Sequence, residues 1–329
     1  WTRCQSLAKP SSHEYMHMGE TTTRFLKRMP RISRGENRFM KDSWYPLPVR
    51  FRTICGFLLL SVCAMPMMAV DEGVSRELAR ERARLISNVR YGLDVRLEKR
   101  AAKMQGRESV EFTLSAVPVG GLVLDFRDLD AKGATLDGEA RSLRVNGAAE
   151  ELHQAAGHIM VPARGLKKGE NKVELEFASG IAEANRAVTR YVDTQDGSEY
   201  LYTLFVPMDA SLAFPCFDQP DLKGKFTLKV TKPADWTVIA NTAGVPKGET
   251  EVAFAETRPI STYLFAFAAG PFEKLTAESD ATALELWVRK SQVARAKEEW
   301  PRIADVTRRG MEKMVDFLAK PFHLPKYDK

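Results

Sequence analysis

The side chains that could do chemistry are few and scattered along this chain. His153 and His158 are the closest histidine pair, but they are five positions apart, whereas two zinc ligands on one helix face need the four-residue step of HExxH. His323 stands between two prolines, where we expect a surface or interface position. Asp128 and Asp130 stand among turn residues, where we expect solvation. Taken alone, these side chains identify no catalytic, substrate-binding or metal-binding residue.

The cysteines also argue against a reactive centre. Cys216 lies far from the other three, Cys4, Cys55 and Cys63, which all fall in the first 69 residues. The rest of the chain therefore has neither an internal disulfide nor a CxxC metal motif. A lone thiol beside aromatic residues is best interpreted as a small buried hydrophobe. The sequence also lacks a nucleophile elbow, a P-loop and a dinucleotide-binding fingerprint.

The distribution of charge argues against a nucleic-acid partner. The composition, 44% hydrophobic and 28% charged, is that of a soluble globular protein, and the formal net charge is +6. Residues 1–69 carry a net charge of +7, so residues 70–329 carry −1. Because the basic excess belongs to the leader, the folded part offers no general attraction for polyanions.

Residues 40–69 have the pattern of a secretory signal peptide. Arginines precede the apolar run Ile54–Ala64, and Ala69 supplies a small residue at a suitable cleavage point. Met40 gives a start, so we expect residues 1–39 to be upstream sequence without a fold. The apolar run is shorter than the roughly 20 residues of a membrane span. We therefore expect export to the periplasm or outside the cell without a stable membrane span, an uncleaved anchor being the alternative.

The elements that follow are mostly strands. After a short lead-in helix within residues 70–87, apolar and polar residues alternate from Asn88 to Leu97, as in a half-buried strand. Asn146-Gly147 and Asp196-Gly197 have the chemistry of tight hairpin turns. The segments with strand patterns predict a mainly β, antiparallel sandwich or saddle; they are Val110–Leu114, Leu122–Phe126, Lys172–Phe177, Tyr200–Phe205, Phe226–Val230, Thr237–Ala240 and Tyr263–Ala268.

The pattern changes after Pro271. A strand, Ala283–Val288, leads into a predicted helix, Val293–Leu318, and Pro321 follows it. The apolar stripe of this helix consists of Ile303, Val306, Gly310, Met314 and Leu318. Since no later segment could cover that stripe, we expect a domain that is cut short here and a chain of marginal solubility.

One segment is far more specific than the rest. In the run from Phe214 to Pro220, Pro215 and Pro220 fix the backbone, Cys216 and Phe217 can pack inward, and Asp218 can accept backbone hydrogen bonds. This run closely resembles the FPCFDEP signature of the N-terminal domain of the M1 zinc aminopeptidases, the aminopeptidase N family.

Further blocks agree with that family in the same order. Thr203–Pro207 is similar to its TQFEP run, Trp236–Asn241 to a WxVxSN strand, Ser261–Gly270 to an STYLxAFxVG strand, and Phe322–Asp328 to the YPLPKxD run. The resemblance covers roughly residues 85–329.

The resemblance implies an N-terminal β domain over residues 88–272, and over 273–329 the first strand and helix of a truncated α/β, thermolysin-like catalytic domain. It also implies an enzyme that uses zinc to remove N-terminal residues from peptides. The family's HExxH and GxMEN motifs lie beyond its YPLPKxD run and are not in this sequence. We therefore expect this chain alone to bind no zinc and to be inactive.

Departures from the family pattern leave alternatives open. Leu204 and Val206 stand where the family has the Gln and Glu of the substrate pocket, so neither role is carried over. Gln219 replaces the usual Glu, and Ser211-Leu212 a basic pair. The alternatives are a non-catalytic binding or scaffold module of the same β fold, and a freestanding extracellular sandwich with an unrelated ligand.

Overall fold

The structure is a computed structural model that describes residues 73–127, 138–184, 186–277, 283–320 and 326–328. Several predictions concern residues outside these ranges: the upstream segment 1–39, the signal peptide 40–69, Cys4, Cys55, Cys63, Asp128, Asp130 and His323. Only the backbone is described for the last three residues, 326–328.

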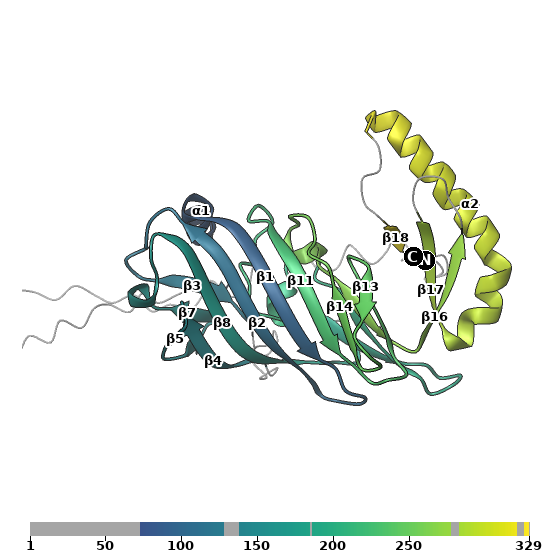
Figure 1. Cartoon of the computed structure of the whole chain (residues 1–329), viewed down its shortest axis with the longest axis horizontal. Coiled ribbons are helices and arrows are strands. Elements are labelled where there is room, and N and C mark those ends of the chain that lie inside the picture. The colour runs from purple at the N-terminus through teal and green to yellow at the C-terminus, as the bar shows by residue number, and fades with distance from the viewer. Residues whose placement is uncertain (1–72, 128–137, 185, 278–282, 321–325, 329) are drawn as a thin grey trace, which may run out of the picture. The chain divides into compact units, whose positions relative to one another are not determined.

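An eight-stranded sheet is the largest element of the fold (Figure 1). In spatial order its strands are β13 Gly244–Pro246, β14 Glu251–Phe254, β11 Gly224–Thr231, β1 Ile86–Arg96, β2 Lys103–Leu114, β8 Gly169–Gly180, β4 Glu139–Val145 and β5 Ala148–Ala149. Neighbours are antiparallel except β1 and β11, which are parallel. The prediction of a mainly β fold with antiparallel sheets is confirmed.

Alternation of side chains explains why these residues form strands with one face toward the core. On β1, Val89, Tyr91, Leu93 and Val95 are buried, while the residues between them are exposed or half-buried. The tight turn predicted at Asn146-Gly147 joins β4 to β5, and both residues have positive φ. The outward face of the sheet is left to polar and charged side chains.

Two smaller sheets complete the main core. One has the order β12 Thr237–Ala240, β15 Phe267–Gly270, β10 Glu199–Thr203 and β9 Val188–Val192; the other has β3 Leu122–Asp125, β7 His158–Val161 and β6 His153–Ala155. Their apolar residues join those of the large sheet in one cluster. Phe265 lies at its centre, with ring centroids 4.6 Å from Phe226 and 5.6 Å from Phe214.

The helix before β1 spans Arg76–Leu85 (α1), within the segment for which a short helix is expected. Ser75 caps it by accepting a hydrogen bond from the Leu78 amide at 3.1 Å. Only Arg82 and Leu85 are buried, so a single inward face holds α1 in place.

A second, smaller core lies at the end of the chain. Its strands are β16 Phe272–Ala277, β17 Ala283–Arg289 and β18 Lys326–Asp328, and its helix is α2, Val293–Leu318, with the bounds predicted from the sequence. Trp300 and Ala304 of α2 pack with Leu284, and the Trp300 indole donates to the Thr276 carbonyl at 3.1 Å. Within the described residues, no helix has the length and hydropathy that crossing a membrane would require.

The prediction that the α2 stripe lacks any partner is wrong for Ile303, which packs against this second core together with Met311. Val306, Met314 and Leu318 are 53–55% exposed, as expected. The helix faces its sheet through Trp300, Ala304 and Met311, positions that recur at four- and seven-residue steps. The apolar stripe predicted from the sequence therefore lies mostly on a different side of α2 from the face that packs against the sheet.

The strand predicted over Tyr263–Ala268 is also wrong in its first half. Residues Thr262–Leu264 form a 3-10 turn, and β15 begins only at Phe267. The side chain of Asn241 donates to the Leu264 carbonyl at 2.9 Å and accepts from the Ala266 amide at 2.8 Å. An asparagine thus holds backbone groups that a neighbouring strand would otherwise bind.

One carboxyl group, that of Glu108, is buried in the main core among apolar side chains. Glu108 lies on the inward face of β2 between Leu93 and Leu175, and neither of its carboxyl oxygens has a hydrogen-bond partner within the described residues. Burial raises its pKa well above the ordinary value of 4.5. The fold therefore favours the protonated acid.

We predict that Glu108→Gln makes the protein less sensitive to rising pH. Because the pKa is raised in the fold, the stability of the native protein is full below about pH 4.5 and falls as the pH rises toward the folded pKa. At about pH 8 the variant should gain about 1–3 kcal/mol in the free energy of unfolding. Denaturant titrations across this pH range measure the effect. Glu111→Gln, at an exposed position of the same strand, is the control, and an equal gain there would contradict the prediction.

Candidate functional site

The segment Pro215–Pro220 is anchored to β3. The Asp125 amide donates to the Cys216 carbonyl at 2.7 Å, and the Cys216 amide donates to the Asp125 carbonyl at 3.0 Å. Cys216 and Phe217 are fully buried. Burial raises the pKa of the Cys216 thiol well above its usual value, so the thiol is protonated and unsuited to act as a nucleophile.

Asp218 connects this segment to two others. Its carboxylate accepts from the Ser211 amide at 3.0 Å and from the Thr262 hydroxyl at 2.7 Å, and its own amide donates to Asp125 Oδ2 at 2.8 Å. The Ser261 hydroxyl donates to the Pro220 carbonyl at 2.6 Å. Asp218 therefore positions backbone and has no free oxygen directed at a pocket.

Asp125 is the centre of the buried network. The guanidinium of Arg82 donates to both of its oxygens, at 2.7 and 2.8 Å, and also to the Val123 carbonyl at 2.7 Å. His158 Nδ1 lies 2.9 Å from Asp125 Oδ1. Burial alone would raise the pKa of Asp125, but its contacts with His158 and Arg82 hold it below the ordinary value. The carboxylate is thus ionised and fully used.

The two histidines weighed as a metal pair are not brought together. His158 is buried, with Nε2 3.0 Å from the Gly73 carbonyl, whereas His153 is exposed and lies 3.4 Å from Glu151. Among the described residues, no three His, Cys, Asp or Glu side chains are grouped to hold a metal ion. The donor atoms of the described residues therefore do not fit zinc.

The Thr203–Pro207 segment reaches the surface where β10 ends. Leu204 and Val206 are 66% and 53% exposed, while Phe205 between them is buried. Thr203 holds the segment to β15, since its hydroxyl donates to the Phe267 carbonyl and accepts from the Phe267 amide, both at 2.8 Å. The two side chains that depart from the family pattern are therefore available to an external molecule.

A shallow hollow beside this segment brings three of the sequence blocks together. It has a volume of about 370 Å³, and Thr203, Asn241 and Phe267 are among its lining residues. Tyr202, also in its lining, has its pKa raised to about 12 by burial. None of the residues that line the hollow carries a side chain suited to act as a general acid or base near neutral pH.

Sequence reasoning placed Cys216, Phe217 and Asp218 correctly in a buried crossing but missed what they contact. Arg82 and Asp125 are 43 residues apart. Nothing in the periodicity of either segment pairs them. The one local signal was an arginine on the apolar side of a short helix.

We predict that Arg82→Met destabilises the protein by about 3–5 kcal/mol in the free energy of unfolding, because it leaves Asp125 charged, buried and deprived of its bidentate partner. The pKa of Asp125 is depressed, so its contribution to stability is present above the unfolded pKa of about 3.9 and is lost as the pH falls. The variant should therefore also show a smaller loss of stability in acid. Arg84→Met, exposed on the same helix, is the control. Similar effects of the two substitutions on denaturant unfolding would rule out this role for Arg82.

Comparison with known proteins agrees with this arrangement. Residues 87–264 match the model of the peptidase M1 N-terminal domain. The chain is 27% identical over 257 residues to an aminopeptidase N of Streptomyces lividans, which covers 78% of this chain and 29% of that relative. It is 26% identical over 248 residues to an aminopeptidase N of Acetobacter pasteurianus (72% and 68%), and 30% identical over 148 residues to a glutamyl aminopeptidase of Sus scrofa (43% and 15%).

The chain thus spans about three tenths of the length of the Streptomyces relative. The matched region contains Asp125, the Pro215–Pro220 segment and the end of β10, and Arg82 lies just before it. Because the match to the family model takes in more than half of the chain, this chain belongs to the M1 peptidase family, of which it carries the N-terminal domain.

Proposed function

We propose that this chain is the N-terminal portion of an exported zinc aminopeptidase that removes N-terminal residues from peptides. The observation that carries the proposal is the match of residues 87–264 to the M1 N-terminal domain, together with relatives named as aminopeptidases. The signal-peptide pattern of residues 40–69 supports export.

In this proposal residues 88–272 are the N-terminal β domain and residues 273–329 begin the catalytic domain. The separate core of Leu284, Trp300 and Ala304 supports that division. Zinc, which in such an enzyme would polarise the scissile carbonyl, is assigned to a part of the protein that this sequence does not include. The residues described here would contribute shape and contacts to the substrate pocket.

Leu204 and Val206 are the residues we assign to that contribution. Both are exposed and apolar, and they lie at the end of β10 beside the hollow that includes Thr203. A leucine and a valine cannot bind a free α-amine as an amide and a carboxylate would. The wall they form would instead favour apolar contact with the substrate.

The same two residues favour a second candidate, a non-catalytic binding or scaffold module of the M1 β fold. The two candidates differ in a direct assay. The product of the whole gene, supplied with zinc, should hydrolyse aminoacyl-p-nitroanilides and lose that activity with a chelator, whereas the 329-residue chain alone should be inactive. Absence of hydrolysis by the whole gene product would favour the scaffold, and hydrolysis by the chain alone would refute the proposal.

We predict that Val206→Glu combined with Leu204→Gln shifts the whole enzyme toward free amino ends. A restored carboxylate would form one charge-assisted hydrogen bond with the α-amine, so kcat/KM for a free peptide relative to its acetylated form should rise about tenfold. Val245→Glu is the control, because Val245 is 55% exposed on β13 in a different sheet. An unchanged ratio would show that Leu204 and Val206 do not face the amine.

A further inference from the structure

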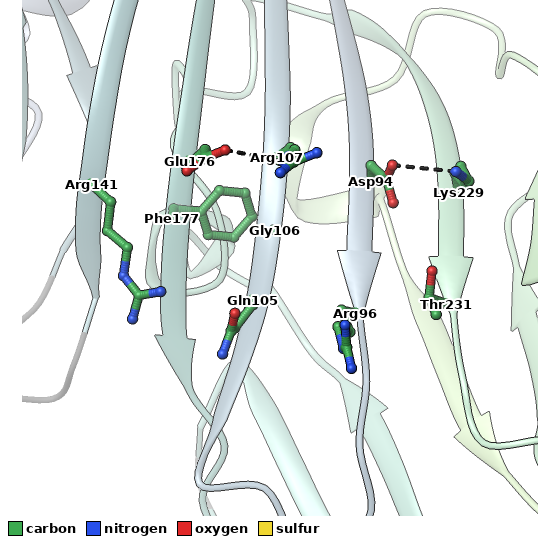
Figure 2. Close-up of a pocket in the computed structure, with 10 residues that line it drawn as sticks. All are labelled: Asp94, Arg96, Gln105, Gly106, Arg107, Arg141, Glu176, Phe177, Lys229 and Thr231. Carbon is green, nitrogen blue, oxygen red and sulfur yellow. Dashed lines mark hydrogen bonds and ion pairs between the residues drawn. The ribbon is translucent and has the colours of Figure 1, made fainter.

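The outward face of the large sheet carries charged side chains in rows that run across neighbouring strands, and two of these rows differ in their balance of charge. Strands in register place exposed residues side by side about 4.8 Å apart. One row consists of Lys229, Asp94, Arg107 and Glu176, on β11, β1, β2 and β8. Its signs alternate, and ion pairs of 3.5 Å and 3.0 Å join Lys229 to Asp94 and Arg107 to Glu176 (Figure 2). The four charges of this row sum to zero, and Lys229 is also paired with Glu251 of β14 at 2.9 Å.

A second row on the same four strands breaks the alternation. It consists of Lys225, Arg90, Glu111 and Lys172, three cations and one carboxylate. Lys225 and Arg90 are direct neighbours and share one carboxylate, Glu256, at 2.8 and 3.6 Å. Like charges placed opposite one another destabilise a sheet. Lys172 is paired with Glu174 at 2.8 Å, so neighbouring carboxylates partly offset the cations of this row.

Two further lysines add to this excess. The four residues of the second row line a groove with a volume of about 830 Å³. Lys167 and Lys223 also line this groove, and neither has a carboxylate within ion-pair distance among the described residues. The groove lining holds five cations against two carboxylates, those of Glu111 and Glu170. Glu256 and Glu174, outside the lining, pair with three of the five cations, which leaves the charges of Lys167 and Lys223 unpaired among the described residues. That local excess contrasts with the net charge of −1 for residues 70–329.

We propose that this groove, the cationic groove, binds an acidic polypeptide segment. The carboxylate of Glu111 stands between Arg90 and Lys172, so a polymer with a negative charge on every unit would be repelled at the centre of the row. A polypeptide can place its carboxylates on the cations and neutral residues against Glu111. The proposal rests on the register of the sheet and is independent of the peptidase proposal.

The test uses the full chain and a fluorescein-labelled peptide of alternating Glu and Ser, followed by fluorescence anisotropy. The peptide should bind at low ionic strength and release as salt is added, and the Gln/Ser analogue should not bind. Lys167→Gln combined with Lys223→Gln should weaken binding about tenfold. Arg107→Gln combined with Lys229→Gln removes the same charge from the alternating row and should change binding by less than about twofold.

Each other result overturns the proposal. Equal weakening by the two double variants would show attraction by net charge alone. If the Glu/Ser peptide does not bind at low salt, the cationic groove is not a binding site for acidic segments. Tighter binding of heparin or of phosphatidylserine vesicles than of the peptide, lost with Lys167 and Lys223, would assign the groove to a polyanion or a lipid surface. Thermal unfolding of both double variants checks that the fold is retained.

Discussion

The ion pair between Arg82 and Asp125 is the interaction on which the rest of the main domain depends. It joins α1 to β3, and both side chains are almost fully buried, so either charge without its partner would be strongly unfavourable. The bidentate geometry, the contact with His158 and the amide of Asp218 together use every acceptor site of the carboxylate. Through Asp218 the same network reaches Ser211 and Thr262, so segments from the whole length of the domain converge on one group.

The residues of this network position the backbone, and other residues of the domain are exposed to partner molecules. The polar residues Asp218 and Gln219 of the Pro215–Pro220 segment are buried and bind backbone groups. The exposed residues that other molecules can reach lie at the end of β10 and on the outward face of the large sheet. The buried part makes the fold specific, and the exposed parts can differ between members of the family at little cost to stability. Leu204 and Val206 are such a difference.

Local patterns in the sequence predicted local structure well. The alternation from Val89 to Leu97 follows from burial of one face of β1. The predicted helix Val293–Leu318 is also present, although most of its predicted apolar stripe is exposed. What failed depends on distant partners. Near Leu264 the chain forms a turn instead of the predicted strand, and the side chain of Asn241 binds its backbone. The face of α2 that packs on the second core also differs from the predicted one. The rows of charged residues on the large sheet could not be predicted from the sequence either, because they depend on the register of four strands.

The parallel pairing of β1 with β11 has a consequence for how the chain folds. Val89 pairs with Gly224, so more than a hundred residues separate these two neighbouring strands of the sheet along the chain. Such a contact closes a long loop, and its entropic cost must be met before the contact stabilises anything. The hairpin of β1 and β2 can form early, but its other edge stays open until β11 has been synthesised. Completion of the sheet is therefore a late step, and until then the nascent domain exposes an unpaired strand edge to chaperones and to other chains.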